Sequence, residues 1–516
     1  MDFKFVLLWT DTALWAMFAV MLAYGVRVVR HPQLRSTWAR VLRDPAALCA
    51  GLVLLLFVSV AALDSVHFRR ALAPNGDQAA SQAASQAVLQ PAQPGASQTA
   101  APTAVSSAVS TSVSTGSRVF YDSRTESLLD LVLARQLAMR ETSYSEPLAY
   151  LANTKDSVTR NGQVTREFPR LLHGGAHLSD PARQWPSDLW QRALAGLVGG
   201  LLLAVLIAAA LCAWLGRKHG GFAKAARELL TDRTDLPLRA LMITVTLVCL
   251  LAGPVIALMG HYHVFGTDRT GNDVLVQTLK SIRTAFVIGM LSTVATLPLA
   301  VGLGILAGYF RGWVDEVVQY FYTTLSSVPN VLLIAACVLM VQVALDKHPE
   351  WFETGAERSD LKVFLLCAIL GLTGWAGLCR LVRAETLKLR ELEFVQAAAA
   401  FGVSPLRIMG RHVLPNVMHL VLITTVLSFS ELILYEAVLT YVGVGVDPST
   451  SSFGGMINLA RSEMSRDPVV WWSFAAAFTF MVALVLAANL FADAVRDAFD
   501  PRSRLLRPRL QLRKLV

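Results

Sequence analysis

Long apolar segments alternate with shorter polar ones along most of this chain. A helix that crosses a membrane needs about 20 predominantly apolar residues. Segments of that kind lie near 5–28, 46–63, 193–215, 239–260, 285–309, 326–345, 361–382, 414–441 and 471–492. The first has no basic leading region and no clear small-residue cleavage site, so we expect a retained helix rather than a signal peptide. The pattern predicts an all-α polytopic membrane protein with nine spans.

The longest interruption of this pattern lies between the second and third spans, at 64–191. Residues 77–118 are almost entirely Ala, Ser, Gln, Val, Thr, Pro and Gly, a composition that predicts disorder because it offers little apolar surface to bury. The composition changes at Phe120. Apolar residues then recur at helical spacing over 127–139, which predicts an amphipathic helix. We expect 120–190 to form a small helical element on the external face, either in contact with a partner or lying on the membrane surface without one.

Composition and charge agree with a membrane protein and indicate its orientation. The chain has 516 residues, of which 54% are hydrophobic and 16% charged, whereas about a quarter of the residues of a soluble domain are charged. Arginine and lysine collect in the connections 29–45 and 216–238 and in the tail 501–516. Positive charge marks cytoplasmic segments, so we expect the C-terminus inside and the N-terminus and 64–191 outside. The basic residues are spread over several loops, which disfavours a nucleic-acid partner.

The sequence shows no catalytic or metal-binding constellation. It has no phosphate loop for ATP and no zinc-protease or serine-hydrolase motif. All six cysteines fall in predicted spans, so no disulfide framework is indicated. His261 and His263 flank a tyrosine at the end of the fourth span, where either a proton or metal role or an interfacial polar cluster is open. We expect no catalytic residue, no metal site and no cofactor bound by this chain.

A patterned connection follows the seventh span. The run Ala397–Ala400 favours a helix, and Gly402 is placed to end it in the left-handed conformation. Ser404 then suits an N-cap and Pro405 the first position of a second helix.

Leu414 and Pro415 are expected to end this second helix. Two short helices joined at a glycine would form a compact projection, which we call the knob (393–415). The pattern alone fits equally well a knob that enters a groove on a partner and a surface hairpin without a partner.

The knob resembles the cytoplasmic "EAA" loop of ABC importer permeases, which docks on the ATPase subunit. The glutamate of that pattern is Gln396 here. The resemblance implies an ATPase-coupling surface made of Gln396, Ala397, Ala398, Gly402, Ser404, Ile408, Leu414 and Pro415.

The second half of the chain, about 263–503, resembles the C-type permeases of the dipeptide and oligopeptide importers. Four motifs carry the resemblance in order: His263–Asp273, Ala307–Asp315, Glu436–Pro448, and Asn489, Asp493, Arg496-Asp497 and Asp500-Pro501. The fold implied is a type I ABC importer (MetI-like) permease core of five spans at 263–500. Additional segments precede and follow it: two spans in 1–63, the insertion 64–191, two spans in 192–262, and the basic tail 501–516.

Two carboxylates lie within the eighth span. Glu431 and Glu436 are five positions apart and so point to different helix faces. Charges inside a membrane are costly and are usually functional. We assign both to the translocation pathway, facing a cavity or a subunit interface; the alternative for each is a packing contact with Ser or Tyr.

The resemblance implies a non-catalytic permease subunit of an ATP-driven importer in the bacterial inner membrane, with peptides as the main cargo of the family. The implied partners are a second permease subunit, two ATPase subunits that bind ATP and Mg²⁺, a periplasmic solute-binding protein and membrane lipid. A secondary transporter or channel working without ATPases is the alternative. The knob favours the ATP-driven importer, and we find no inverted repeat of the kind common in secondary transporters.

Overall fold

The computed structural model describes residues 3–71, 125–160, 163–219, 221–231, 236–352 and 354–499. Residues 77–118, for which we predict disorder, and the basic tail 501–516 lie outside the described residues. Within them, nine helices are long and apolar enough to cross a membrane, the number that the hydropathy pattern predicts.

The N-terminal region forms strand β1 (Phe3–Val6), helices α1 (Trp9–Arg30), α2 (Pro32–Arg43) and α3 (Pro45–Asp64), and strand β2 (His67–Arg70). The first span therefore begins later than predicted, because residues 3–6 pair with β2 in an antiparallel sheet that β3 (Glu126–Ser127) completes. Prolines occupy the first positions of α2 and α3, where no helical N–H is lost.

The insertion is only partly helical, which corrects the expectation for 120–190. The predicted helix at 127–139 forms two short helices, α5 (Leu128–Val132) and α6 (Ala134–Ala138). An antiparallel hairpin follows, made of β4 (Asp156–Arg160) and β5 (Gln163–Glu167). The sequence between these strands is Asn-Gly, which favours a two-residue hairpin turn over a helix.

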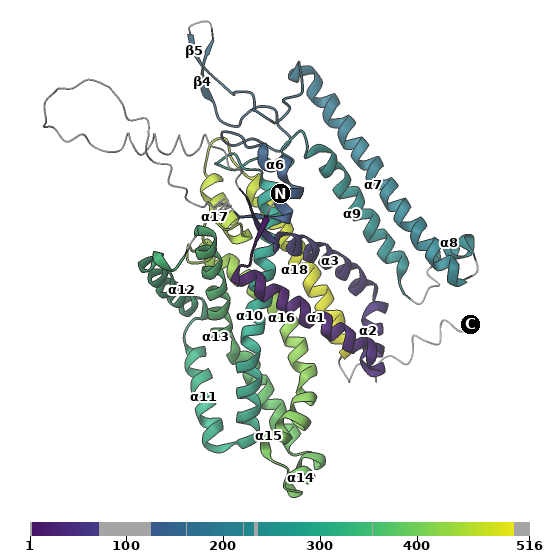
Figure 1. The fold of residues 1–516 in the computed structure, drawn as a ribbon, viewed down its shortest axis with the longest axis vertical. Coiled ribbons are helices and arrows are strands. Elements are labelled where there is room, and N and C mark those ends of the chain that lie inside the picture. The colour runs from purple at the N-terminus through teal and green to yellow at the C-terminus, as the bar shows by residue number, and fades with distance from the viewer. Residues whose placement is uncertain are drawn as a thin grey trace, which may run out of the picture.

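A helical hairpin separates the insertion from the C-terminal half. It consists of α7 (Pro181–His219), α8 (Phe222–Leu230) and α9 (Leu238–Leu258). Glycines let α7 and α9 approach closely: a Cβ on Gly200 would lie 2.2 Å from the carbonyl oxygen of Cys249, and one on Gly253 would lie 2.2 Å from that of Gly196. Figure 1 shows this hairpin beside the main bundle.

The C-terminal half is the main bundle. Its elements are α10 (Val274–Phe310), α11 (Gly312–Ser327), α12 (Asn330–Lys347), a 3₁₀ turn (Pro349–Trp351), α13 (Gly355–Arg390), α14 (Glu393–Ala400), α15 (Pro405–Ile408), a π-helical turn (Met409–Val413), α16 (Leu414–Tyr441), α17 (Phe453–Glu463) and α18 (Trp472–Phe499). Helices α10 and α13 extend well past the predicted spans 285–309 and 361–382, because polar residues continue each helix beyond its apolar segment. Helix α11 was not predicted; its sequence is less apolar than that of a span.

Helices α10 and α13 pack together at the centre of the bundle. A Cβ on Gly308 would lie 2.6 Å from Cβ of Thr386, and one on Gly371 would lie 2.4 Å from Cβ of Ala295. Small residues at such contacts let helix backbones approach where no hydrophobic driving force acts between helices. In Figure 1 the insertion and the N-terminal sheet lie at one end of the bundle, and α14 lies at the opposite end.

Candidate coupling site and the clasp at the opposite end

Helix α14 ends as the sequence predicts. Gly402 has a φ of +74°, in the left-handed region. The N–H of Gly402 donates to the carbonyl oxygen of Ala399 (3.0 Å), and the N–H of Val403 donates to that of Ala398 (3.1 Å). This pair of bonds is a Schellman motif, which satisfies the last carbonyls of a helix and reverses the chain.

The second piece of the knob begins as predicted and ends differently. Ser404 is the N-cap of α15 and Pro405 occupies its first turn, although the serine side chain makes no capping bond. Leu414 and Pro415 do not end this piece, which corrects the prediction. The chain continues through the π-helical turn 409–413 into α16 as one unbroken helical segment.

The π-helical turn explains why proline is accepted there. Within an α-helix a proline removes one hydrogen bond and clashes with the carbonyl four residues earlier. Here the N–H of Leu414 donates to the carbonyl oxygen of Met409, a wider turn than in an α-helix. The side-chain amide of Asn416 donates to the carbonyl oxygen of His412 (2.6 Å), so that acceptor is also satisfied.

One face of the knob is buried and the other is an exposed apolar surface. Ile408 and Val413 are fully buried in a cluster with Val382 of α13 and Ile305 of α10. In contrast, Phe401 is 88% exposed and Leu406 is 74% exposed. An exposed aromatic and an exposed leucine at the tip of a firmly anchored projection are typical of a surface that a partner covers.

The predicted coupling residues divide between these two faces. Gln396, Ala397, Gly402, Ser404 and Pro415 are exposed, and Ala398 and Leu414 are half-buried. Ile408 is buried and anchors the knob rather than contacting anything outside. The Gln396 amide donates to the carbonyl oxygen of Glu391 (3.2 Å), so this side chain caps the end of α13.

Polar contacts join the end of α13, which leads into the knob, to neighbouring helices. Arg390, at the end of α13, donates to the carbonyl oxygen of Tyr309 in α10 (2.7 Å). Arg383 pairs through two hydrogen bonds with Asp315 of α11 (2.5 and 2.6 Å). These contacts link α13 to both α10 and α11 close to the knob.

The structure separates the two carboxylates of α16. Glu436 is buried, accepts a hydrogen bond from the hydroxyl of Thr440 (2.8 Å) and lies against Gly454 of α17. These contacts with its own helix and with α17 fit the packing alternative for Glu436, and its assignment to the pathway stays a prediction. Glu431 is exposed.

A second motif region lies at the opposite end of the bundle, where His263 sits between two carboxylates. Its Nδ1 lies 2.8 Å from Oδ2 of Asp273 and its Nε2 lies 3.5 Å from Oε1 of Glu141. All three residues are buried. We call Glu141, His263 and Asp273 the clasp, because Glu141 belongs to the insertion and the other two belong to the bundle.

Backbone contacts complete the clasp. The Glu141 carboxylate accepts hydrogen bonds from the N–H groups of Leu172, His173 and Gly174 at 2.8–3.0 Å. The N–H of Glu141 donates to the carbonyl oxygen of Gly271 (3.0 Å). The two chain segments are so close that a Cβ on Gly271, whose φ is +76°, would lie 1.8 Å from the Glu141 carbonyl oxygen.

These contacts shift the pKa values of His263 and Glu141. Burial opposes the charging of His263, but Asp273 and Glu141 outweigh it and raise the pKa of His263 to about 9. Burial likewise opposes the charging of Glu141, but His263 and the three N–H donors lower its pKa to about 2. The clasp is therefore an ion cluster with a charged histidine at neutral pH. Of the two alternatives for His263, a polar cluster fits this geometry, in which both ring nitrogens face carboxylates. In the described ranges, no group of three or more His, Cys, Asp or Glu side chains is placed to hold a metal ion.

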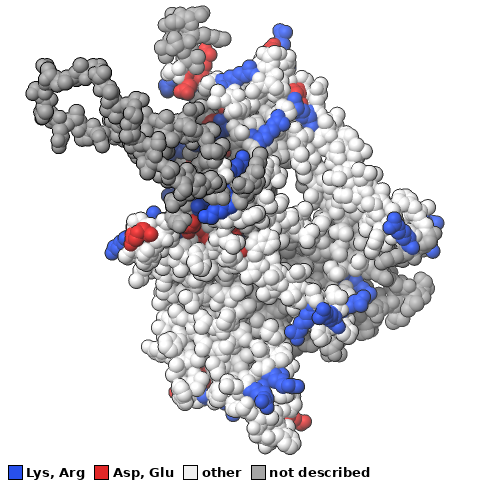
Figure 2. Space-filling model, in the orientation of Figure 1, with Lys and Arg blue, Asp and Glu red and all other residues white. Residues whose placement is uncertain are grey.

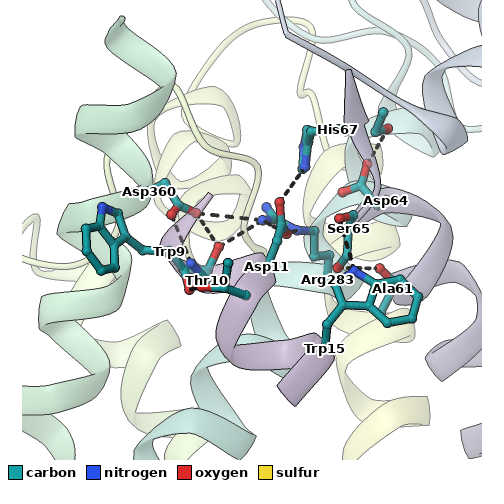
Figure 3. Close-up of polar contacts among 12 residues, drawn as sticks. Trp9, Thr10, Asp11, Trp15, Ala61, Asp64, Ser65, His67, Arg283 and Asp360 are labelled. Carbon is teal, nitrogen blue, oxygen red and sulfur yellow. Dashed lines mark hydrogen bonds and ion pairs between the residues drawn. The ribbon is translucent and has the colours of Figure 1, made fainter. Parts of the chain in front are cut away.

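Sequence reasoning missed a third polar cluster, which joins α1 to the bundle (Figure 3). Arg283 of α10 donates through Nε to Oδ1 of Asp11 (3.1 Å) and lies 3.7 Å from Oδ1 of Asp360 in α13. The N–H of Thr10 donates to Oδ2 of Asp360 (3.0 Å), and Asp11 also contacts Nδ1 of His67 (2.7 Å). The available signal was Asp11 inside an apolar segment, since a charge there needs a partner.

Comparison with known proteins places this chain in a family. Residues 300–505 match the family of binding-protein-dependent transport system inner membrane components. The oligopeptide transport system permease protein OppC of Mycobacterium tuberculosis (strain ATCC 25618 / H37Rv) is 33% identical over 248 residues, which are 48% of this chain and 79% of that protein. OppC of Haemophilus influenzae is 31% identical over 246 residues, 48% of this chain and 72% of that protein. The dipeptide permease DppC of Lactococcus lactis subsp. cremoris is 30% identical over 243 residues, 47% of this chain and 64% of that protein.

A solved structure of the MetNI methionine ABC transporter in an inward-facing conformation covers 44% of this chain and 96% of its own at 17% identity. Its TM-score of 0.33 is too low to place any residue. The sequence relatives decide the matter, because the chain spans more than two thirds of both OppC proteins at over 30% identity. Helices α1 to α3 and α5 to α9 precede the residues that the family matches. The chain belongs to the family of inner-membrane permease components of binding-protein-dependent ABC importers.

Proposed function

We propose that this permease subunit moves peptides across the bacterial inner membrane, together with a second permease subunit, two ATPase subunits and a periplasmic solute-binding protein. The names of the relatives, oligopeptide and dipeptide transport permeases, support the peptide cargo. In this proposal ATP and Mg²⁺ bind to the ATPase subunits, and this chain contributes no catalytic group. The N-terminus and the insertion lie in the periplasm, and the knob and the C-terminus lie in the cytoplasm.

The knob carries the coupling part of the proposal. Its tip offers Phe401 and Leu406 to a partner while its base is buried against α10 and α13. An apolar side chain that is desolvated in a groove supplies binding energy. The anchored base transmits the groove's movement to helices that cross the membrane. The alternative, a secondary transporter, has no ATPase subunit to cover such a surface.

The exposed position of Glu431 indicates that α16 carries a contact surface in addition to the knob. It shares one exposed helix face with Leu427, Leu434 and Val438, since these positions are spaced by three and four residues. A carboxylate directed at lipid from the middle of a span would be costly. We infer that this face meets the second permease subunit and borders the pathway. A Glu431→Leu variant that assembles and transports normally would contradict this placement.

The coupling proposal is tested in proteoliposomes that hold the complete importer. Gly402→Trp should insert and assemble, but peptide uptake per ATP hydrolysed should fall by about tenfold, which corresponds to a coupling loss of about 1.4 kcal/mol. Gly402→Asn is the matched control, because asparagine tolerates the left-handed conformation and adds less bulk. Normal uptake by the tryptophan variant would exclude a docking role for the knob. The wild-type importer could instead take up no peptide while the binding protein still stimulates its ATP hydrolysis. That result would exclude peptides as the cargo and leave the coupling proposal standing.

A further inference from the structure

A surface rich in arginine lies where α1 ends and α2 begins, and neither coupling nor transport uses it. Residues 27–44 contain five arginines and one aspartate and no other Asp, Glu or Lys, which leaves a net charge of +4. The five are Arg27, Arg30, Arg35, Arg40 and Arg43. Figure 2 shows basic side chains without acidic neighbours in the part of the molecule where Figure 1 places α2.

The described residues of the chain do not neutralise this charge. In the part of the structure that is described, no carboxylate pairs with any of the five arginines. The carboxylate of Asp44, the acidic residue of the segment, accepts the N–H of Ala46 (3.1 Å) and so caps α3. Arg40 donates to the hydroxyl of Thr37 (3.2 Å), a neutral partner. The surface therefore keeps its charge available for an external anion.

Packing holds these arginines in place. Val41 of α2 is buried against Ala494, Val495 and Ala498 of α18. The ring of Trp38 lies 5.7 Å from that of Phe499. Because α2 is fixed on α18 by this face, Arg35 and Arg43 are presented on the other side, where both are exposed.

Exposed apolar side chains lie between the arginines. Val26 and Val29 alternate with Arg27 and Arg30 at the end of α1, and Leu42 is next to Arg43. A surface that mixes guanidinium groups with exposed aliphatic side chains suits the boundary between lipid headgroups and acyl chains. It suits a soluble acidic partner less well, since such a partner would leave the aliphatic groups uncovered or in water.

We propose that the end of α1 together with α2 forms a binding surface for anionic phospholipid headgroups of the leaflet that this surface faces. The arginines contact the lipid phosphates, and Val26, Val29 and Leu42 contact the upper acyl chains. Clusters of four to eight basic residues next to a span attract anionic lipid in this way. The lipid contacts α1 and α2, and α2 packs on α18, so bound lipid helps to hold the N-terminal helices on the bundle at the end where the Arg283 cluster does not reach.

The test uses the full-length chain purified in mild detergent. Its thermal unfolding midpoint is measured with added dioleoyl-phosphatidylglycerol or dioleoyl-phosphatidylcholine. Phosphatidylglycerol should raise the midpoint and phosphatidylcholine should not. High salt should shrink the rise, because it screens exposed charges. The triple variant Arg35→Gln, Arg40→Gln, Arg43→Gln should lose most of the rise, whereas lysine at the same three positions should keep it.

Two controls make the test decisive. A second triple variant on the insertion, Lys155→Gln, Arg166→Gln, Arg183→Gln, removes the same charge from exposed positions elsewhere and should keep the full rise. Should the first triple variant fail to fold, the single variants Arg35→Gln and Arg43→Gln replace it, each with a smaller loss. An equal rise with phosphatidylcholine, an equal rise with inorganic phosphate, or a full rise in the glutamine variant would each overturn the proposal.

Discussion

The clasp and the knob lie at opposite ends of the bundle, and both contain a tight turn at a glycine. The turn in the clasp is packed within the chain, and the turn in the knob is exposed. Each contains a glycine in the left-handed conformation, with φ of +76° at Gly271 and +74° at Gly402. Around Gly271 the insertion leaves no room for a side chain, whereas a Cβ added to Gly402 would have no neighbouring atom within 4 Å in the described structure. The clasp is complete within this chain, and the knob is not.

The same contrast holds for the side chains. In the clasp, Glu141, His263 and Asp273 are buried and satisfy one another's charge. On the knob, Phe401 and Leu406 remain largely exposed. Side chains that are buried and paired within the chain stabilise its fold. Side chains that stay exposed are available to a partner. The motif at 263–273 therefore attaches the insertion, and the exposed side chains of the knob support the coupling role that we propose.

Alanine substitution of the two glycines should separate them most strongly. Both variants carry the left-handed strain of about 1–2 kcal/mol for a residue with a Cβ. Gly271→Ala adds a clash with the Glu141 carbonyl oxygen, which lies 1.8 Å from the Cβ position. We expect Gly271→Ala to abolish the folded chain in detergent and Gly402→Ala to lower its unfolding midpoint slightly, as measured by thermal unfolding.

The test depends on which of the two variants is more destabilised, and not on the size of either loss. If Gly402→Ala were as damaging as Gly271→Ala, the strain alone would account for both. The insertion would then not be seated against Gly271 as the structure shows.

A smaller effect is expected from pH. The pKa of His263 is raised from 6.5 to about 9, so its contribution to stability is complete below pH 6.5 and is lost as pH rises through 9. The pKa of Glu141 is lowered from 4.5 to about 2, so its contribution is present above pH 4.5 and is lost as pH falls through 2. The histidine contributes on the order of 3 kcal/mol at most.

The unfolding midpoint between pH 6 and 10 measures this contribution. The wild-type chain should lose stability across that range, and His263→Gln should be less stable at pH 6 and change less with pH. A variant that follows the wild-type curve in parallel would show that another group titrates.

The smallest effect on the fold is expected from a test of sidedness. Single cysteines in place of Lys155 on the insertion and Ser404 on the knob, in a background without the native cysteines, change only exposed positions and should leave stability within about 0.5 kcal/mol. An impermeant thiol reagent applied from the periplasm should label the first and not the second. Labelling of both from that side would contradict the orientation that we propose.

The sequence determined the elements whose signals are local. Nine apolar segments indicated the number of spans, since a membrane accepts backbone only in helices or closed barrels. Gly402 marked the end of α14, and Ser404-Pro405 marked the start of α15, because caps depend on a few neighbouring residues. The helix ends were less predictable: α10 and α13 continue past their apolar segments, where hydropathy carries no information.

Only the tertiary structure decided which distant groups meet. Glu141 lies far before His263 in the chain, and nothing near either residue indicates that they form one cluster. The same holds for Asp11 with Arg283, and for Glu436, whose burial depends on the position of α17. Apolar pattern and caps are properties of adjacent residues, whereas the partner of a buried charge is set by the path of the whole chain.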